Sequence, residues 1–345
     1  YNEYMAYITN GIDENEVRME VTMNQVLTDK LIADERKKKG YDQFARALFV
    51  MHGVTDEPER LSGGWTNCVF AAGGFVLRYT TNIESGRLRR ETRLAQSLPA
   101  KVGYPEIVDS GSTDGCDWML CRRILGTNLE DAWERLSWDE RAVALEQLWM
   151  RAKHVHAINP DTVRAFVNEN LWYITTMENA LREAEALKES NVIKVEQYEA
   201  VRGYIYRFEA AMKQAKCVLV HGDLTPANAM WHDGKITALM DFECAAIAPK
   251  EADLMMLLNT AYERGDLSVA ESDFTAKQRF NDRMRALVEK ETPDREILQG
   301  YQAMKLMHHV CMDMNDEDFS EEHEELVCLL ALLKDGKGKF LEVMP

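Results

Sequence analysis

Asp223, Asn228 and Asp241 are three oxygen-bearing side chains placed where apolar, strand-like runs of the sequence end. Asp223 follows the run 217–220, Asn228 comes five residues later in the same loop, and Asp241 ends the next predicted hairpin. Such a loop and hairpin can bring the three groups to one point. A carboxylate there can accept the proton of an attacking hydroxyl, and amide and carboxylate oxygens are ligands that Mg²⁺ prefers. We therefore predict a catalytic role for Asp223 and a Mg²⁺ site at Asn228 and Asp241.

The order of these residues follows the H-x-D-x-x-x-x-N plus D-F-x pattern of kinase-fold phosphotransferases. Gly222 stands where protein kinases have arginine, Glu243 replaces the glycine of D-F-G, and an A-P-E segment is absent, so a protein kinase is disfavoured. Together with the Asp233-Gly234 turn, the segment resembles the aminoglycoside phosphotransferase and choline kinase-like family. The resemblance covers roughly 42–345 and is strongest over 217–254. Thr225 departs from it, because many relatives carry a ring there.

The resemblance also implies which residues hold the nucleotide, ATP or GTP. A phosphate-covering turn is expected early in the chain, followed by a strand arginine in place of the usual lysine, a helix glutamate as its ion-pair partner, and an interlobe hinge whose backbone binds adenine. The corresponding residues are Ser62, Gly63, Gly64 and Asn67 for the turn, Arg78, Glu91, and then Cys121, Arg122 and Arg123 for the hinge. Asp253 resembles the residue that braces the catalytic loop.

The elements that must position these groups form two predicted lobes. Two strands at 67–71 and 75–79, a helix at 85–98 and a further strand pair at 107–108 and 118–121 form a small sheet with one helix. Beyond residue 126 the pattern is helical, including 169–188 and 194–215, and a second group of strands interrupts it at 217–220, 229–231 and 236–242.

This order of elements predicts an α+β, bilobal, protein-kinase-like fold with a small β-rich N-lobe and a larger helical C-lobe. We place an N-terminal extension at 1–41, the N-lobe with its nucleotide-binding sheet and helix at 42–122, and the C-lobe with the catalytic loop and acceptor-binding helices at 123–345. The helical His154 and His156 are interpreted as packing or surface residues.

The composition agrees with a two-lobed globular protein of 345 residues, of which 46% are hydrophobic and 29% charged. The formal net charge of −17 argues against binding nucleic acid or an anionic membrane and would tolerate a cationic small molecule. No apolar stretch approaches the roughly 18 residues of a membrane helix, and we see no signal peptide. Seven scattered cysteines without a C-x-x-C pair favour a reducing, cytoplasmic location.

The resemblance therefore implies a Mg²⁺-dependent enzyme that transfers the γ-phosphoryl group of ATP or GTP to a hydroxyl of a small, cationic molecule such as an aminoglycoside-like antibiotic. The alternative is a metabolic kinase for choline, homoserine, a methylthio-sugar or fructosamine. A third interpretation is a nucleotide-binding pseudokinase. The presence of Asp223 and of both predicted metal ligands argues against it. The sequence leaves open the acceptor, the choice of nucleotide, the oligomeric state and the role of residues 1–40.

Overall fold

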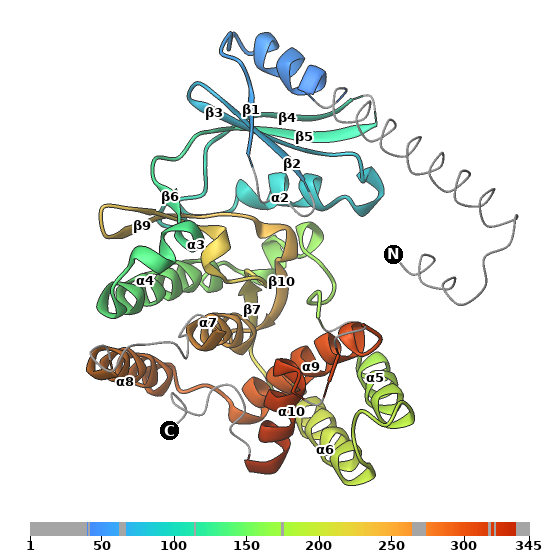
Figure 1. The fold of residues 1–345 in the computed structure, drawn as a ribbon. Coiled ribbons are helices and arrows are strands. Elements are labelled where there is room, and N and C mark those ends of the chain that lie inside the picture. Colours follow the sequence, from blue (N-terminus) through green and yellow to red (C-terminus); the bar gives the residue numbers. More distant parts are fainter. Residues whose placement is uncertain are drawn as a thin grey trace, which may run out of the picture. The chain divides into compact units, whose positions relative to one another are not determined.

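A computed structural model of the chain describes residues 40, 42–61, 67–113, 115–173, 176–263, 274–316, 319–320 and 322–335. It divides into two compact units, Tyr1–Thr80 and Thr81–Pro345 (Figure 1). The lobe boundaries predicted after residues 41 and 122 remain predictions.

The first unit contains a helix over residues 42–51 and an antiparallel meander of three strands. The strands are β1 (Glu59–Arg60), β2 (Cys68–Ala72) and β3 (Phe75–Thr80), as the glycine-punctuated pattern predicts for the last two. Gly73 makes the β2–β3 turn with φ 53°, a backbone conformation that favours glycine. The ring of Phe44 packs edge-on against that of Tyr79 at 5.1 Å between centroids, which joins the helix to the strands.

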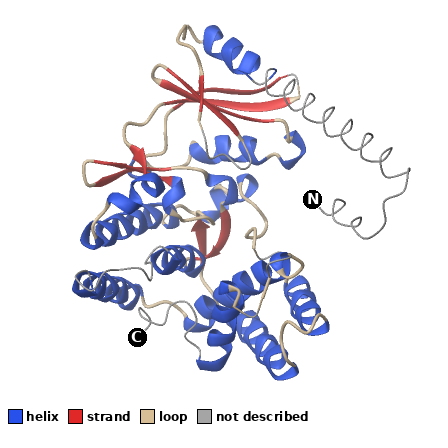
Figure 2. Ribbon diagram, in the orientation of Figure 1, coloured by secondary structure: helices blue, strands red, loops and turns tan. Residues whose placement is uncertain are grey.

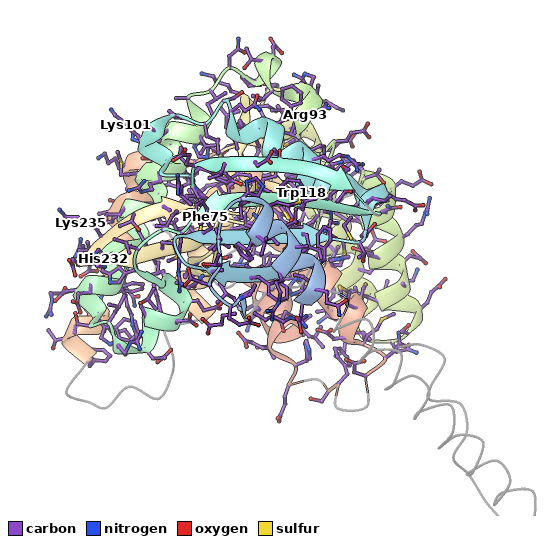
Figure 3. All side chains as sticks on the ribbon, turned by 90° about the horizontal axis from the view of Figure 1, so that it is seen from above. Phe75, Arg93, Lys101, Trp118, His232 and Lys235 are labelled. Carbon is purple, nitrogen blue, oxygen red and sulfur yellow. The ribbon has the colours of Figure 1, made fainter. Side chains whose placement is uncertain are left out.

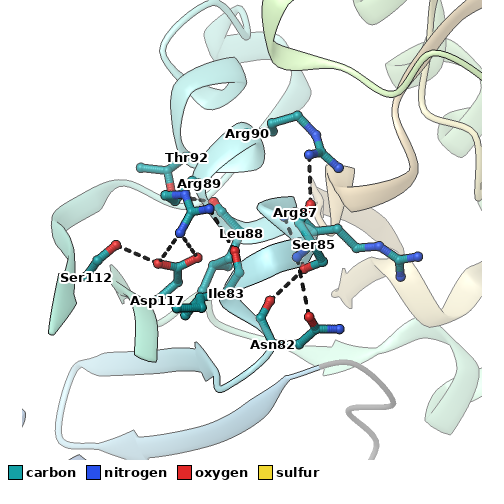
Figure 4. Close-up of polar contacts among 10 residues, drawn as sticks. All are labelled: Asn82, Ile83, Ser85, Arg87, Leu88, Arg89, Arg90, Thr92, Ser112 and Asp117. Carbon is teal, nitrogen blue, oxygen red and sulfur yellow. Dashed lines mark hydrogen bonds and ion pairs between the residues drawn. The ribbon is translucent and has the colours of Figure 1, made fainter. Parts of the chain in front are cut away.

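The second unit begins with helix α2 (Arg87–Ala95) and a hairpin of β4 (Ile107–Thr113) and β5 (Cys116–Arg122). These strands are longer than predicted. The buried residues Leu88, Met119 and Cys121 form a small apolar cluster between helix and hairpin. Asp117 on β5 has a side chain only 1% exposed and accepts hydrogen bonds from Arg89 at 2.7 and 2.8 Å and from Ser112 at 2.5 Å (Figure 4). The ion pair fixes α2 on the hairpin.

Figure 4 shows two partners of the buried Asp117 carboxylate, and Arg89 is the cationic one. Replacing Arg89 by leucine removes this cation. Because hydrogen bonds to charged groups contribute about 1.5–3 kcal/mol, we expect Arg89→Leu to lower the free energy of unfolding by that amount. Thermal unfolding followed by circular dichroism measures the loss. Arg93→Leu is the matched control, since Arg93 is exposed on the same helix (Figure 3), and an equal loss in both variants would contradict the role of the ion pair.

The rest of the second unit is mainly helical (Figures 1 and 2). Its helices are α3 (Leu129–Ala132), α4 (Trp138–His156), α5 (Met177–Glu189), α6 (Val195–Met212), α7 (Glu251–Glu263), α8 (Phe274–Glu291), α9 (Arg295–Asp313) and α10 (Glu324–Asp335). Ser137 and Glu140 form a capping box that starts α4. The helices enclose one large apolar core that includes Trp133, Trp149 and Tyr301. Among the described residues, none of the helices is long and apolar enough to cross a bilayer.

Two small sheets lie within this helical unit and carry the loops of interest. One pairs β7 (Cys217–Val220) with β10 (Ala246–Pro249), and the other has the order β6 (Thr127–Asn128), β8 (Ala229–His232), β9 (Lys235–Leu239). The β8–β9 turn between His232 and Lys235 is exposed (Figure 3). Asp233 and Gly234 both have positive φ there, 47° and 75°, as in the predicted tight hairpin turn.

Two further predicted boundaries are wrong. The strand expected to reach residue 242 ends at Leu239, because Asp241 adopts a left-handed conformation with φ 62°. The helix expected from residue 169 begins only at Met177. The residue preceding that stretch, Asn168, forms an isolated bridge to Ala246 instead.

Candidate active site

The loop between β7 and β8 brings Asp223 and Asn228 into direct contact. Nδ2 of Asn228, a residue only 8% exposed, donates to the Asp223 carbonyl oxygen and to Asp223 Oδ2, both at 2.9 Å. The backbone N–H of Met240 donates to the carbonyl oxygen of Asn228 at 2.8 Å. This bond holds Met240, the residue directly before Asp241, against the loop. The structure thus gathers the three residues singled out from the sequence, although their roles remain predictions.

Burial raises the pKa of Asp223, and the charge of Asp241 adds to the rise. His221, the hydrogen bond from Asn228 and the charge of Lys305 act in the opposite direction. A raised pKa makes a carboxylate a stronger base, which suits a group that receives a hydroxyl proton. Burial, together with the charges of Asp223 and Asp241, likewise raises the pKa of the Cys244 thiol to about 12, so this thiol is protonated.

Asp253, in the first turn of α7, holds the loop of His221 and Gly222 in place. It is fully buried, and its two carboxylate oxygens accept the backbone N–H groups of His221 and Gly222, each at 2.9 Å. His156 Nε2 lies 2.8 Å from Asp253 Oδ2. Burial alone would raise the pKa of Asp253, but the bonds and charges of His156 and His221 lower it. The bracing contacts expected of Asp253 are therefore present in the structure.

His156 is a packing residue, as interpreted from the sequence, and it also contributes to this support. Its ring packs edge-on against Trp149 on α4 and reaches Asp253. The sequence gives no local signal for the pair, because its members lie 97 positions apart. Only the packing of α4 against α7 brings them together.

Gly222 has no room for a side chain. Its φ is 80°, and a Cβ would lie 2.2 Å from the carbonyl oxygen of Cys244. We expect Gly222→Ala to destabilise the protein by clearly more than the about 1–2 kcal/mol of a left-handed backbone alone, and to lower kcat because the loop must shift. Gly234→Ala is the matched control, since Gly234 has φ 75° with no heavy atom within 4 Å of its Cβ position. Equal melting temperatures of the two variants would contradict the steric argument.

Glu91 on α2 points to the residue after Asp241. The side chain is 1% exposed, and its Oε1 accepts the backbone N–H of Phe242 at 3.0 Å and the hydroxyl of Tyr104 at 2.9 Å. The contact to Phe242 was not predicted. The ion pair expected between Glu91 and Arg78 joins residues of different units and remains a prediction.

The donor atoms around Asp241 suit a divalent cation. Carboxylate oxygens of Glu91, Asp241 and Glu243 lie within 4.8 Å of one another. Charges of one sign at this spacing repel, and a bound cation relieves the repulsion. Asn228 uses its nitrogen on Asp223, which leaves its oxygen for a ligand role. Hard oxygens of this kind are what Mg²⁺ requires, so the residues present fit the predicted ion.

A segment that sequence reasoning missed covers the other side of the loop. Asn168 Nδ2 donates to the carbonyl oxygens of Glu243 and Ala245 at 2.7 and 3.0 Å, and its Oδ1 accepts from Arg90 on α2 at 2.9 Å. Leu171 Cδ2 lies 3.4 Å from the Cβ position of Gly222. Residues 168–173 are therefore fixed against the catalytic loop.

The residues expected to bind the nucleotide are spread over both units. Arg78 lies on β3 opposite Val69, Asn67 is buried, and Cys121 and Arg122 end β5, where Arg122 N–H donates to Glu106 O at 2.9 Å. Arg123 is exposed. Ser62, Gly63 and Gly64 lie outside the described residues. The nucleotide-binding role of all these residues remains a prediction.

A comparison with known protein families shows to which family this chain is related. The model of the phosphotransferase enzyme family matches residues 57–287, more than half of the chain. The chain belongs to the phosphotransferase enzyme family. None of the curated proteins matches it in sequence. Membership in this phosphotransferase family confirms the relationship inferred from the motif around Asp223.

Solved structures similar to this family member show the same bilobal, kinase-like α+β fold. The GDP complex of aminoglycoside 2′-phosphotransferase-IIIa is 19% identical, with a TM-score of 0.61 over 86% of this chain and 97% of that chain. ADP-bound APH(2″)-Ib is 14% identical, with a TM-score of 0.57 over 84% and 98%. A ternary complex of APH(4)-Ia with AMP-PNP and hygromycin B is 16% identical, with a TM-score of 0.58 over 86% and 99%. The predicted fold class is confirmed.

Proposed function

We propose that this phosphotransferase uses Mg²⁺ and ATP, or GTP, to phosphorylate a hydroxyl of a small molecule in the cytoplasm. The observation that supports the proposal most strongly is the hydrogen bond between the side chains of Asn228 and Asp223. The backbone of Asn228 is in turn bonded to Met240, the neighbour of Asp241. Nucleotide use is supported by the GDP, ADP and AMP-PNP complexes of the similar structures.

In this proposal Asp223 accepts the proton of the acceptor hydroxyl. Its raised pKa and its hydrogen bond from Asn228 favour a fixed, basic carboxylate. Asn228 and Asp241 would hold Mg²⁺, which neutralises charge on the transferred phosphoryl group when bound. Arg78 and the 62–67 turn would contact the nucleotide phosphates, and residues 121–123 its base. Positioning and electrostatics supply most of the rate enhancement, because phosphoryl transfer asks little covalent chemistry of the protein.

Two classes of acceptor follow from the family relationship. Aminoglycoside-like antibiotics form the first, since similar structures are described with kanamycin and with hygromycin B. Metabolic alcohols, such as those phosphorylated by choline or homoserine kinases, form the second.

The test is phosphoryl transfer measured directly. The protein is incubated with Mg·ATP or Mg·GTP and a panel of aminoglycosides, sugars, amino alcohols and hydroxy acids, and phosphorylated products are identified by ³¹P NMR and mass spectrometry. We expect a phosphomonoester with at least one acceptor and its loss when Mg²⁺ is chelated. Calorimetric failure to bind both nucleotides in the presence of Mg²⁺ would refute the proposal.

A further inference from the structure

A cavity outside the candidate active site lies between helix α4, strand β9 and the short 3₁₀ helix Ala100–Val102. Its volume is about 470 Å³, within the roughly 300–1,000 Å³ of pockets that hold small molecules. Lys101, Arg151 and His154 line it, and among the described residues that do so none is acidic. The chain as a whole has a net charge of −17, so a cavity with this lining is a local exception.

Arg151 is fixed in the wall of this cavity by contacts with the backbone. Its Nη1 donates to the carbonyl oxygen of Lys101 at 2.9 Å, and its Nη2 donates to that of Ile236. Gly103 leaves room for the guanidinium, since its φ is 73° and a Cβ there would lie 2.6 Å from Arg151 Nη1. A guanidinium has five N–H donors, so these two bonds leave donors for a ligand.

The charge of Arg151 is not balanced by a carboxylate of the described residues, although other cations of α4 are paired. Arg141 lies 3.7 Å from Glu134. Lys153 lies 2.8 Å from Glu291. Burial lowers the pKa of Arg151, and no carboxylate acts in the opposite direction. A partly buried cation of this kind is stabilised by an anion from outside the chain.

Lys101 and His154 complete the basic lining. Lys101 is exposed (Figure 3). His154 is partly buried and follows Arg151 by three residues, so both lie on the same face of α4. Within the described ranges, neither the Lys101 side chain nor the His154 side chain has a hydrogen bond or an ion pair. An ammonium has three N–H donors and an imidazole at least one, and all of these are available to a ligand.

The cavity and the candidate active site lie on different sides of α4. His154 lines the cavity, whereas His156 reaches Asp253. Residues two apart on a helix point about 200° away from each other, which is nearly the opposite direction. None of the described lining residues is a predicted catalytic, metal-binding or nucleotide-binding residue. A ligand of the cavity would therefore be distinct from the substrates of the proposed phosphoryl transfer.

We propose that this cavity is a second ligand site, which binds a small phosphate-bearing molecule through Arg151, Lys101 and His154. A phosphomonoester carries a charge of about −1.5 to −2 at pH 7 and has three acceptor oxygens. It therefore matches two cations better than a carboxylate does. The planar fork of an arginine can pair with two phosphate oxygens at once. Met150 also lines the cavity, is 50% exposed, and offers an apolar contact to the organic part of the ligand.

The experiment measures the binding of simple phosphates by isothermal titration calorimetry. Inorganic phosphate, glycerol 3-phosphate and glucose 6-phosphate are titrated into the protein with and without saturating Mg·ADP. Glycerol and glucose are the uncharged controls, and gluconate tests a carboxylate. We expect at least one phosphomonoester to bind in both conditions, at least about tenfold more tightly than its uncharged control and than gluconate, because charged hydrogen bonds are lost in the former and weaker charge pairing is left in the latter.

A double variant, Lys101→Met with His154→Gln, tests the residues without disturbing the fold. Neither side chain has a partner within the described ranges, so the melting temperature of the unliganded protein should not fall. The Kd of the phosphomonoester should rise at least about tenfold. Lys216→Met is the matched control, since Lys216 is exposed and does not line the cavity. It removes one positive charge as well and should leave the Kd unchanged.

Arg151→Met should weaken binding at least as much as the double variant. It also removes the donor to two backbone carbonyls, so its melting temperature should fall. For this reason the double variant, rather than Arg151→Met, decides whether a loss of binding is due to the ligand contacts.

Several results would overturn the proposal. These are no binding of any phosphate, binding that saturating Mg·ADP abolishes, or a Kd that the double variant leaves unchanged. Tighter binding of gluconate would overturn the phosphate, and tighter binding of a phosphoserine peptide than of every small phosphate would overturn the small molecule. The proposal does not rest on phosphoryl transfer. A protein that transfers no phosphoryl group but binds phosphomonoesters through Lys101 and His154 would refute the proposed function and support this site.

Discussion

Asp223→Asn is expected to lower kcat about 10²–10⁴-fold, the usual contribution of a general base. The amide cannot accept the acceptor's proton, yet it is nearly the same shape as the carboxylate, so the loop should keep its structure. Binding of Mg·ADP should change little, because the residues expected to hold the nucleotide are others. Steady-state kinetics measure the first effect and isothermal titration calorimetry the second.

Two comparisons make this result specific. Asp161→Asn changes an exposed carboxylate that pairs with Arg164 at the surface, and it should leave kcat unaltered. If Asp223→Asn retained full activity, Asp223 would not be the base. If it abolished nucleotide binding as well, its role would be structural rather than chemical.

Asp253→Leu should be the most destabilising of these substitutions, by about 3–5 kcal/mol, the usual cost of removing one member of a buried charged pair. The change leaves the buried N–H groups of His221 and Gly222 and the ring of His156 without their acceptor. Activity should fall as well, by about 10²-fold for a displacement of 1 Å in the catalytic loop. Urea unfolding and steady-state kinetics on the folded fraction measure the two effects.

The lowered pKa of Asp253 also predicts a pH dependence. A carboxylate whose pKa is lower in the folded state stabilises the fold at pH values above its unfolded pKa, about 3.9, and this stabilisation is lost as the pH falls through the folded value. The free energy of unfolding of the wild type should therefore decrease below about pH 4, and the decrease should be smaller in Asp253→Asn. Asp282→Asn, which changes an exposed carboxylate, should keep the wild-type slope; equal slopes in all three proteins would contradict the prediction.

The sequence allowed the fold class and the order of the main elements to be predicted, because these depend on local patterns. The run 217–220 is a strand with the predicted bounds, since it is too short for a helix and two of its four residues are the β-branched Val218 and Val220. The predicted strand through residue 242 was too long because Asp241 takes a left-handed backbone that no propensity signals. The helix predicted from residue 169 failed for a tertiary reason, namely the hydrogen bonds of the Asn168 amide to the carbonyls of residues 243 and 245.

The supporting residues of the site could not be predicted in the same way. His156 and Lys305 acquire their surroundings from helices that pack far from them in sequence, and a single sequence contains no record of such packing. The chemistry-bearing residues differ in this respect, because Asp223 and Asn228 lie in one loop whose spacing is itself the signal.

Asn228 joins the proposed base and the proposed cation ligands in one residue, since its amide nitrogen holds Asp223 and its backbone carbonyl holds the strand end before Asp241. Changes in this loop therefore alter both functions together, and selection for a new substrate has little freedom there. Divergence of specificity is instead expected in the helices predicted to bind the acceptor, which do not make these contacts. A library randomised on those helices should yield altered acceptors far more often than one randomised on the loop.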